Sequence, residues 1–192
     1  MNEQLLRTQL CNSARQLWQR GLIVADGGFL SVECHRQRYL VTPTGRRRSD
    51  LANDGLQLLD LGGQYVSGKG VLSPDVWQPH RLSYRAQREP DPGVVEAFHE
   101  IHATAMVEPR NTAAFLRLKN AAKCIELCDL PPIPAIGAYD ETAVTEALRH
   151  LPALLVPPFG LLSVGPYMAT VLNVLERIEH AATIELACMP RP

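Results

Sequence analysis

Two histidines and a glutamate near the middle of the chain have the side chains and the spacing of metal ligands. Glu96, His99 and His102 form a Glu-x-x-His-x-x-His pattern, which His80 could complete. Divalent ions of the zinc type favour such mixed nitrogen and oxygen ligands. Steps of three residues keep these groups on one face only in a helix, whereas the apolar run at 94–98 predicts a buried strand. The alternative interpretation makes both histidines polar residues without a metal.

A second group that could do chemistry is Ser73-Pro74-Asp75. Its hydroxyl and its carboxylate could serve as a nucleophile or a general base, and Asp75 is the candidate catalytic residue. The same residue types are those that turns select, so a plain turn is the other interpretation.

Two further polar features have structural interpretations that we favour. The run Arg46 to Arg48 could attract an anionic ligand, but a short charge run is usually a solvated loop. His80 and Tyr84 lie four residues apart on a predicted helix, where we expect buried, hydrogen-bonded packing residues.

The elements that must position these residues alternate between helices and strands. Residues 3–20 carry apolar side chains at helical spacing and end at Gly21, which predicts a helix. Two short strands at 29–32 and 38–41 predict a hairpin. The uncharged stretch 151–175 is broken by prolines, so it predicts a strand, a turn, a short strand and a helix rather than a membrane span. Other predicted elements are helices at 80–87, 112–129, 142–150 and 167–187, and the start of a helix at 103–106.

The composition bounds the class of protein. The chain has 192 residues, of which 46% are hydrophobic and 20% charged, with a net charge of −1. This content excludes a disordered chain and predicts one soluble domain over residues 1–192. The near-neutral charge predicts no nucleic-acid partner and no membrane partner. The five cysteines are scattered and odd in number, which favours reduced thiols in the cytoplasm.

Five short patterns occur in one order along the chain. They are Gly28-Phe29-Leu30-Ser31, Thr42-Pro43-Thr44-Gly45, Leu72-Ser73-Pro74-Asp75-Val76 followed by His80 and Tyr84, His99-x-x-His102-Ala-Thr-Ala, and Phe159 to Gly165. Together they resemble the class II aldolase/adducin family, whose corresponding segments read G-N-x-S, T-P-[ST]-G, P-S-S-E, H-x-H-x-x-x-A-T-A and H-G-L-L-x-x-G. The resemblance covers about residues 10 to 185. It implies a three-layer α/β/α domain of the α/β class with a mixed, mostly antiparallel central sheet.

The resemblance also implies a site, from which this chain departs. In the family, two histidines of the H-x-H segment and one of the H-G segment hold a divalent metal. The corresponding residues here are Ala97, His99 and Phe159, so one ligand of the three remains. The catalytic carboxylate of P-S-S-E corresponds to Val76, and Asp75 could replace it only if that loop is re-registered. The chain therefore resembles a divergent member that lacks most of the metal and catalytic residues.

The phosphate-binding residues of the family are replaced in part. Pro74 and Asp75 stand where two serines would face a sugar phosphate, and Phe29 replaces an asparagine. Of the phosphate cradle, Thr44 and Gly45 remain. By resemblance the ligand-binding residues are Ser31, Thr44, Gly45 and Ser73.

Two hypotheses of function follow. The first is a pseudoenzyme whose metal and base site has degenerated, acting as a small-molecule-binding or assembly module without a cofactor. The second is a carbon–carbon lyase of the class II aldolase type, either aldolase or decarboxylase, acting on an altered substrate. It would use Asp75, His99 and His102 in a rebuilt cleft, with a possible zinc-type metal. The resemblance further implies a homo-oligomer, often a tetramer. A plain metal-dependent sugar-phosphate aldolase ranks third.

Overall fold

The computed structural model describes residues 2–35, 37–68, 72, 74–88, 103–107, 140–156 and 160–188. These residues include one seven-stranded sheet with the strand order β4-β3-β2-β1-β5-β7-β6, and its six pairings are all antiparallel. The strands are β1 (Phe29–His35), β2 (Arg38–Val41), β3 (Gln57–Asp60), β4 (Tyr65–Ser67), β5 (Ala103–Val107), β6 (Ala153–Val156) and β7 (Gly160–Gly165). Strand β1 therefore lies at the centre of the sheet.

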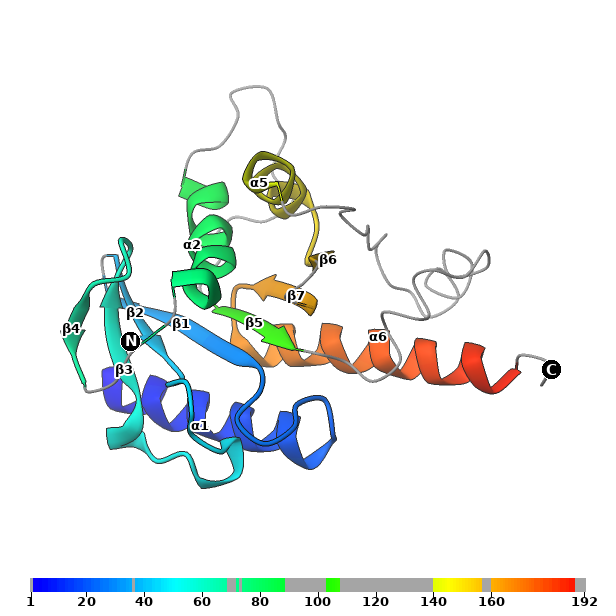
Figure 1. The fold of residues 1–192 in the computed structure, drawn as a ribbon, viewed down its shortest axis with the longest axis horizontal. Helices are drawn as coiled ribbons and strands as arrows, with labels where there is room; N and C mark the ends of the chain where they lie inside the picture. The colour runs from blue at the N-terminus through cyan, green and yellow to red at the C-terminus, as the bar shows by residue number, and fades with distance from the viewer. Residues whose placement is uncertain are drawn as a thin grey trace.

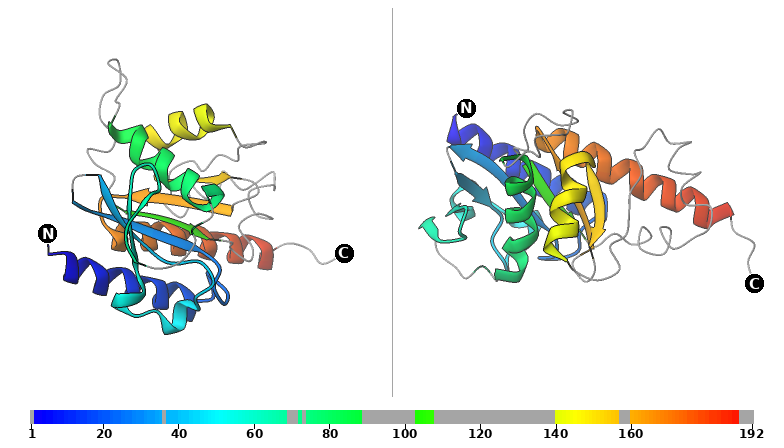
Figure 2. Two further views of the ribbon diagram at one scale, coloured as in Figure 1. Left: turned by 60° about the vertical axis from the view of Figure 1, so that its left-hand side comes forward. Right: turned by 90° about the horizontal axis from the view of Figure 1, so that it is seen from above.

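Within this part of the chain, two helices cover each face of the sheet (Figures 1 and 2). Helices α1 (Glu3–Gln19) and α6 (Met168–Cys188) lie on one face, and α2 (Pro74–Arg88) and α5 (Glu141–His150) lie on the other. Two short 3-10 helices, η1 (Arg48–Asp50) and η2 (Asn53–Gly55), follow β2. The three-layer α/β/α architecture predicted from the sequence is confirmed.

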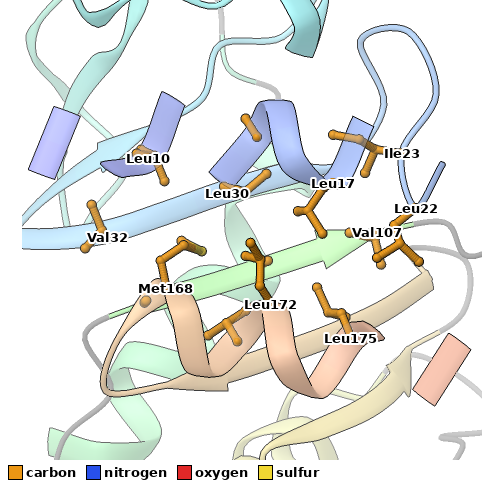
Figure 3. Packing of buried hydrophobic residues seen from close by; sticks show 14 of the residues in the cluster. Leu10, Leu17, Leu22, Ile23, Leu30, Val32, Val107, Met168, Leu172 and Leu175 are labelled. Carbon is orange, nitrogen blue, oxygen red and sulfur yellow. The ribbon is translucent and has the colours of Figure 1, made fainter. Parts of the chain in front are cut away.

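Both faces of the sheet are buried. Successive side chains of a strand point to opposite sides, so one strand can contribute to an apolar cluster on either face. In β1, Leu30 and Val32 join the apolar cluster beneath α1 and α6, whereas Phe29 joins the cluster beneath α2 and α5. Strand β7 divides in the same way, with Leu161 on the first side and Leu162 on the second. Figure 3 shows the first cluster, in which side chains of α1 and α6 converge on β1 and β5.

Helix α1 begins and ends where local sequence signals predict. The side chain of Asn2 accepts a hydrogen bond from Gln4 N at 2.9 Å, which satisfies one of the unpaired amides of the first turn. After the last turn, Gly21 adopts a φ of 72° and Leu22 N donates to Leu17 O at 2.9 Å. The predicted helix with a glycine stop is confirmed.

Helix α2 begins earlier than predicted. It starts at Pro74 rather than at residue 80, and it contains Pro79. Proline suits the first turn of a helix, where an amide has no partner, but inside a helix it usually marks a break. The prediction of a turn at Ser73-Pro74-Asp75 is therefore wrong for its last two residues, while Ser73 lies outside the described residues.

Residues 103–107 form strand β5, so the predicted start of a helix at 103–106 is wrong. All five residues are buried, between β1 and β7. A short apolar run buried on both faces has no periodicity that distinguishes a strand from a helix. The predicted strand at 94–98 and helix at 112–129 fall outside the described residues.

The uncharged stretch 151–175 forms β6, β7 and the start of α6, as predicted. In the described part of the chain, no helix has both the length and the apolar character needed to cross a membrane.

Candidate functional site

Two neighbouring loops carry several of the residues that the motifs mark for ligand binding. One loop leads through Gly28 into β1, and the other follows β2. The buried hydroxyl of Thr42 accepts a hydrogen bond from Leu30 N at 3.0 Å, and Thr42 N donates to Leu30 O at 3.0 Å. The second loop is thus fixed to β1 through Thr42, its first residue. Thr44 and Gly45, which follow in the same loop, are exposed.

Both loops contain a glycine in the left-handed backbone region. Gly28 has a φ of 69°, and a Cβ atom there would collide with Cγ2 of Ile23. Gly45 has a φ of 68°, but a Cβ atom there would meet no atom of the described residues within 4 Å. Gly28 is therefore required by packing and by backbone conformation, whereas none of the described residues crowds Gly45.

The side chain of Arg48 connects the two loops from inside the protein. It is only 1% exposed. Its Nε and Nη2 donate to the carbonyl oxygen of Gly28 at 3.2 and 2.5 Å, and its Nη1 donates to the carbonyl oxygens of Pro43 at 2.7 Å and Arg46 at 2.9 Å. The planar guanidinium can do this because it carries five N–H donors. The prediction of a solvated arginine run is confirmed for Arg46 and Arg47, which are exposed, and is wrong for Arg48.

Arg48 keeps its positive charge at neutral pH. Burial lowers its pKa to about 10, and the carboxylate of Asp26 acts in the opposite direction. No ion pair recorded within the described residues includes Arg48. A cation bound by carbonyl oxygens therefore lies directly behind the Thr42–Gly45 loop.

Ser31, the next candidate ligand residue, lies on β1 and faces α2. It is fully buried, and its Oγ lies 2.7 Å from His80 Nδ1 and 2.8 Å from Tyr84 Oη. Ser83 continues this polar layer, because its hydroxyl lies 2.9 Å from Thr104 Oγ1 on β5. The expectation that His80 and Tyr84 are buried, hydrogen-bonded packing residues is confirmed. Ligand binding by Ser31 stays a prediction.

The surroundings of His80 suppress its titration. The ring of Phe29 meets it edge-on at a centroid distance of 4.8 Å, and Trp77 stacks on it at 6.1 Å. Burial lowers the pKa of His80 to about 3, and burial raises the pKa of Tyr84. In the described part of the chain, His80 Nε2 is buried without a hydrogen-bond partner. Neither side chain is therefore poised to exchange protons near pH 7.

Two replaced family positions contribute apolar surface to this same side of the sheet. Phe29, at the position of the family's asparagine, is 1% exposed and belongs to the cluster beneath α2 and α5. Val76, which the motif predicts to stand at the position of the catalytic carboxylate, is partly buried and packs against that cluster.

The remaining candidates are described only in part. Asp75 lies in the first turn of α2. The structure does not describe Ser73, Ala97, His99, His102 or Phe159. Among the residues that it does describe, no three histidines, cysteines, aspartates or glutamates could hold a metal ion together. The predicted metal ligands His99 and His102 and the catalytic role of Asp75 therefore stay predictions.

A separate surface groove of about 250 Å³ lies between α2 and α5. It is lined by Leu82, Arg85, Glu141, Thr142, Thr145, Glu146 and Arg149. Glu146 pairs there with Arg149 at 2.9 Å. No lining residue belongs to the two loops or to the Ser31 layer, so the groove is not part of the candidate site.

The fold and these motifs define one family. The sequence model of the family described as "Class II Aldolase and Adducin N-terminal domain" matches residues 8–186 of this chain. The match includes every described strand and both candidate loops. The chain belongs to the class II aldolase and adducin family.

Individual relatives are more distant. Methylthioribulose-1-phosphate dehydratase of Pectobacterium atrosepticum is 26% identical over 96% of this chain and 94% of its own length. The 3-oxo-tetronate 4-phosphate decarboxylase of Haemophilus influenzae is 30% identical over 48% of this chain and 42% of its own.

Solved structures show the same fold. YgbL of Escherichia coli has a TM-score of 0.78 at 20% identity, over 99% of this chain and 92% of that one. The L-fuculose-1-phosphate aldolase of Thermus thermophilus has a TM-score of 0.69 at 22% identity, over 93% of each chain. At these identities the likeness establishes the fold alone.

Replacing Ser31 tests whether its hydroxyl holds the fold together. We expect Ser31→Ala to lower the free energy of unfolding by about 1–3 kcal/mol, because it removes a buried partner of both His80 and Tyr84. Urea unfolding measures this change. Ser67→Ala, at an exposed position of β4, serves as the control and should change it by less than about 0.5 kcal/mol. A Ser31→Ala protein as stable as the wild type would contradict the structural role.

The lowered pKa of His80 predicts a pH dependence of stability. The unfolded chain binds a proton at His80 near pH 6.5, whereas the folded protein binds it only near pH 3. The contribution of neutral His80 is therefore complete above pH 6.5 and declines as the pH falls towards 3, by about 1 kcal/mol per pH unit.

Urea unfolding across the range from about pH 4 to 7 checks this prediction. His80→Gln should remove most of that slope, whereas His180→Gln, at an exposed position of α6, should retain it. A wild-type slope in His80→Gln would mean that His80 is not the responsible group.

Proposed function

We propose that this chain binds a small molecule at the loops around Gly28 and Thr42–Gly45 and does not catalyse metal-dependent aldol cleavage. The observation that carries the proposal is the side chain at the position of the catalytic carboxylate. Val76 packs against the apolar cluster beneath α2 and has no group that can move a proton.

The metal ligands support the same proposal. Ala97 and Phe159 have no lone pair to donate, so only His99 remains of the three family ligands. A catalytic zinc site usually has three protein ligands and one open position. The carboxylate and two metal ligands are separate requirements of the reaction, and their combined replacement disfavours aldol cleavage.

We further propose an oligomeric state, a cellular location and a kind of partner for this protein. The family resemblance supports a homo-oligomer, and the scattered thiols support a cytoplasmic location. The net charge of −1 supports a small-molecule ligand rather than a nucleic acid or a membrane as the partner.

Metal content and turnover test the proposal together. We expect the untagged protein, purified without chelators, to hold far less than one divalent ion per chain by mass spectrometry. His99→Ala should leave this content unchanged. The same preparation should not turn over methylthioribulose 1-phosphate or 3-oxo-tetronate 4-phosphate, the compounds named in its relatives.

His180→Ala, an exposed histidine of α6, controls for metal bound non-specifically by imidazoles. One ion per chain in the wild type that is lost in His99→Ala but kept in His180→Ala would overturn the proposal.

A lyase with altered chemistry is the second candidate. It is favoured by the 26% identity to a dehydratase over 96% of this chain. In this case Asp75 would act as the base from the first turn of α2, and His99 and His102 would bind the substrate or a zinc-type metal.

For the second candidate, Asp75→Asn and His99→Ala should each lower turnover of either phosphorylated compound by about 100-fold or more. Asp54→Asn, an exposed carboxylate of η2, is the matched control and should keep full activity. Measurable wild-type turnover that survives both test substitutions would exclude this mechanism.

A further inference from the structure

We propose that Arg48 is the positioning residue of the candidate binding site: its buried guanidinium holds the Gly28 loop and the Thr42–Gly45 loop in one arrangement and places a positive charge behind them for an anionic ligand. This inference rests on the proposed function and names a property of the same site. It concerns a residue that none of the five motifs contains.

The hydrogen bonds of Arg48 determine the orientation of peptide groups in these loops. The guanidinium binds the carbonyl oxygens of Gly28, Pro43 and Arg46 at 2.5–3.2 Å. A trans peptide group is planar, and its C=O and N–H point in opposite directions. The peptide N–H groups that follow Pro43 and Arg46, those of Thr44 and Arg47, are therefore directed away from Arg48.

The charge of Arg48 reinforces this orientation. The carbonyl oxygens of Gly28, Pro43 and Arg46, which would repel an anion, are turned onto the guanidinium, while the N–H groups of Thr44 and Arg47 point away from it. Backbone N–H groups of loops are a recurrent way of binding anions. Burial strengthens the field of a charge because it excludes water. The loop therefore presents a surface that favours an oxyanion such as a phosphate or a carboxylate.

Thr44 and Gly45 are exposed on that loop, together with Arg46 and Arg47. Among the described residues, none has an atom within 4 Å of a Cβ added at Gly45. A ligand can therefore approach Gly45 without displacing any of these residues. Lysine could keep the charge of Arg48, but its single ammonium group cannot span three carbonyl oxygens in a fixed plane.

The experiment is a titration of the 15N-labelled 192-residue chain with inorganic phosphate, monitored by amide NMR well below the unfolding temperature. The variants are Arg48→Lys and Arg48→Gln. Arg7→Lys is the matched control, because Arg7 donates to the carbonyl oxygens of Asn53 and Leu56 in a different loop. A role in stability alone would lower the unfolding midpoint without changing the affinity of the folded protein.

We expect phosphate to shift the amide signals of Thr44, Gly45 and Arg47 in the wild type with one common Kd. Arg48→Lys should raise this Kd at least tenfold and Arg48→Gln at least as much, whereas Arg7→Lys should stay within twofold of the wild type. If the wild type binds phosphate at these amides and both Arg48 variants bind it equally well, the positioning role is overturned.

A measurement on the unmodified protein covers the case in which the Arg48 variants do not fold. The side-chain Nε–H of Arg48 should be protected from solvent exchange and should shift with the same Kd as the loop amides. A rapidly exchanging Nε–H that does not respond to phosphate would overturn the proposal.

The wild-type titration also separates this inference from the proposed function. If phosphate leaves the loop amides unchanged, the anion preference is wrong, while the absence of aldol chemistry is still judged by metal content and turnover. If a stoichiometric metal is found and phosphate binding depends on Arg48, the proposed function fails and the positioning role stands.

Discussion

Strand β1 is paired with a neighbouring strand on each side and is buried on both faces from Phe29 to Val32, so the polar groups of these four residues need partners inside the protein. The hydroxyl of Ser31 meets His80 and Tyr84, and the amide and carbonyl of Leu30 meet Thr42. Helix α2 and the loop after β2 are thus tied to the same strand.

The carbonyl of Gly28, immediately before β1, also has its hydrogen-bond partner inside the protein. It accepts two hydrogen bonds from Arg48, which also reaches the loop after β2. Because a buried cation needs several polar partners, the guanidinium and the loop carbonyls stabilise one another. The candidate site is therefore built outward from β1 rather than assembled from independent surface loops.

The α2 side of the sheet carries two of the substitutions that bear on the proposed function. The motifs predict that Phe29 and Val76 stand in place of a polar and an acidic residue. Phe29 belongs to the apolar cluster there and Val76 packs against it, while the rings of Phe29 and Trp77 contact His80. Such substitutions add buried apolar area, which stabilises the layer. In the proposed function, the same substitutions remove groups that bind phosphate or transfer protons, so the fold persists without the aldolase reaction.

Local sequence signals were sufficient for much of this structure. Helical spacing and the stop at Gly21 predicted α1, and the four-residue spacing of His80 and Tyr84 predicted that they share a helix face and pack. These features depend on residues close together in the chain. The ordered motifs predicted the family because their sequence and spacing survive even where single functional residues do not.

The tertiary structure alone decided three features. Residues 103–107 became a strand because β1 and β7 pair with them on both sides, a contact that their uniform apolar composition does not encode. Helix α2 begins at Pro74 and continues through Pro79, although a proline inside a helix usually marks a break. Arg48 carries the same side chain as Arg46 and Arg47, and it alone of the three is buried because the carbonyls of Gly28 and Pro43 converge on its position. The sequence by itself determined the family and predicted its missing ligands. Which arginine lies behind the loops depended on where distant backbone groups met.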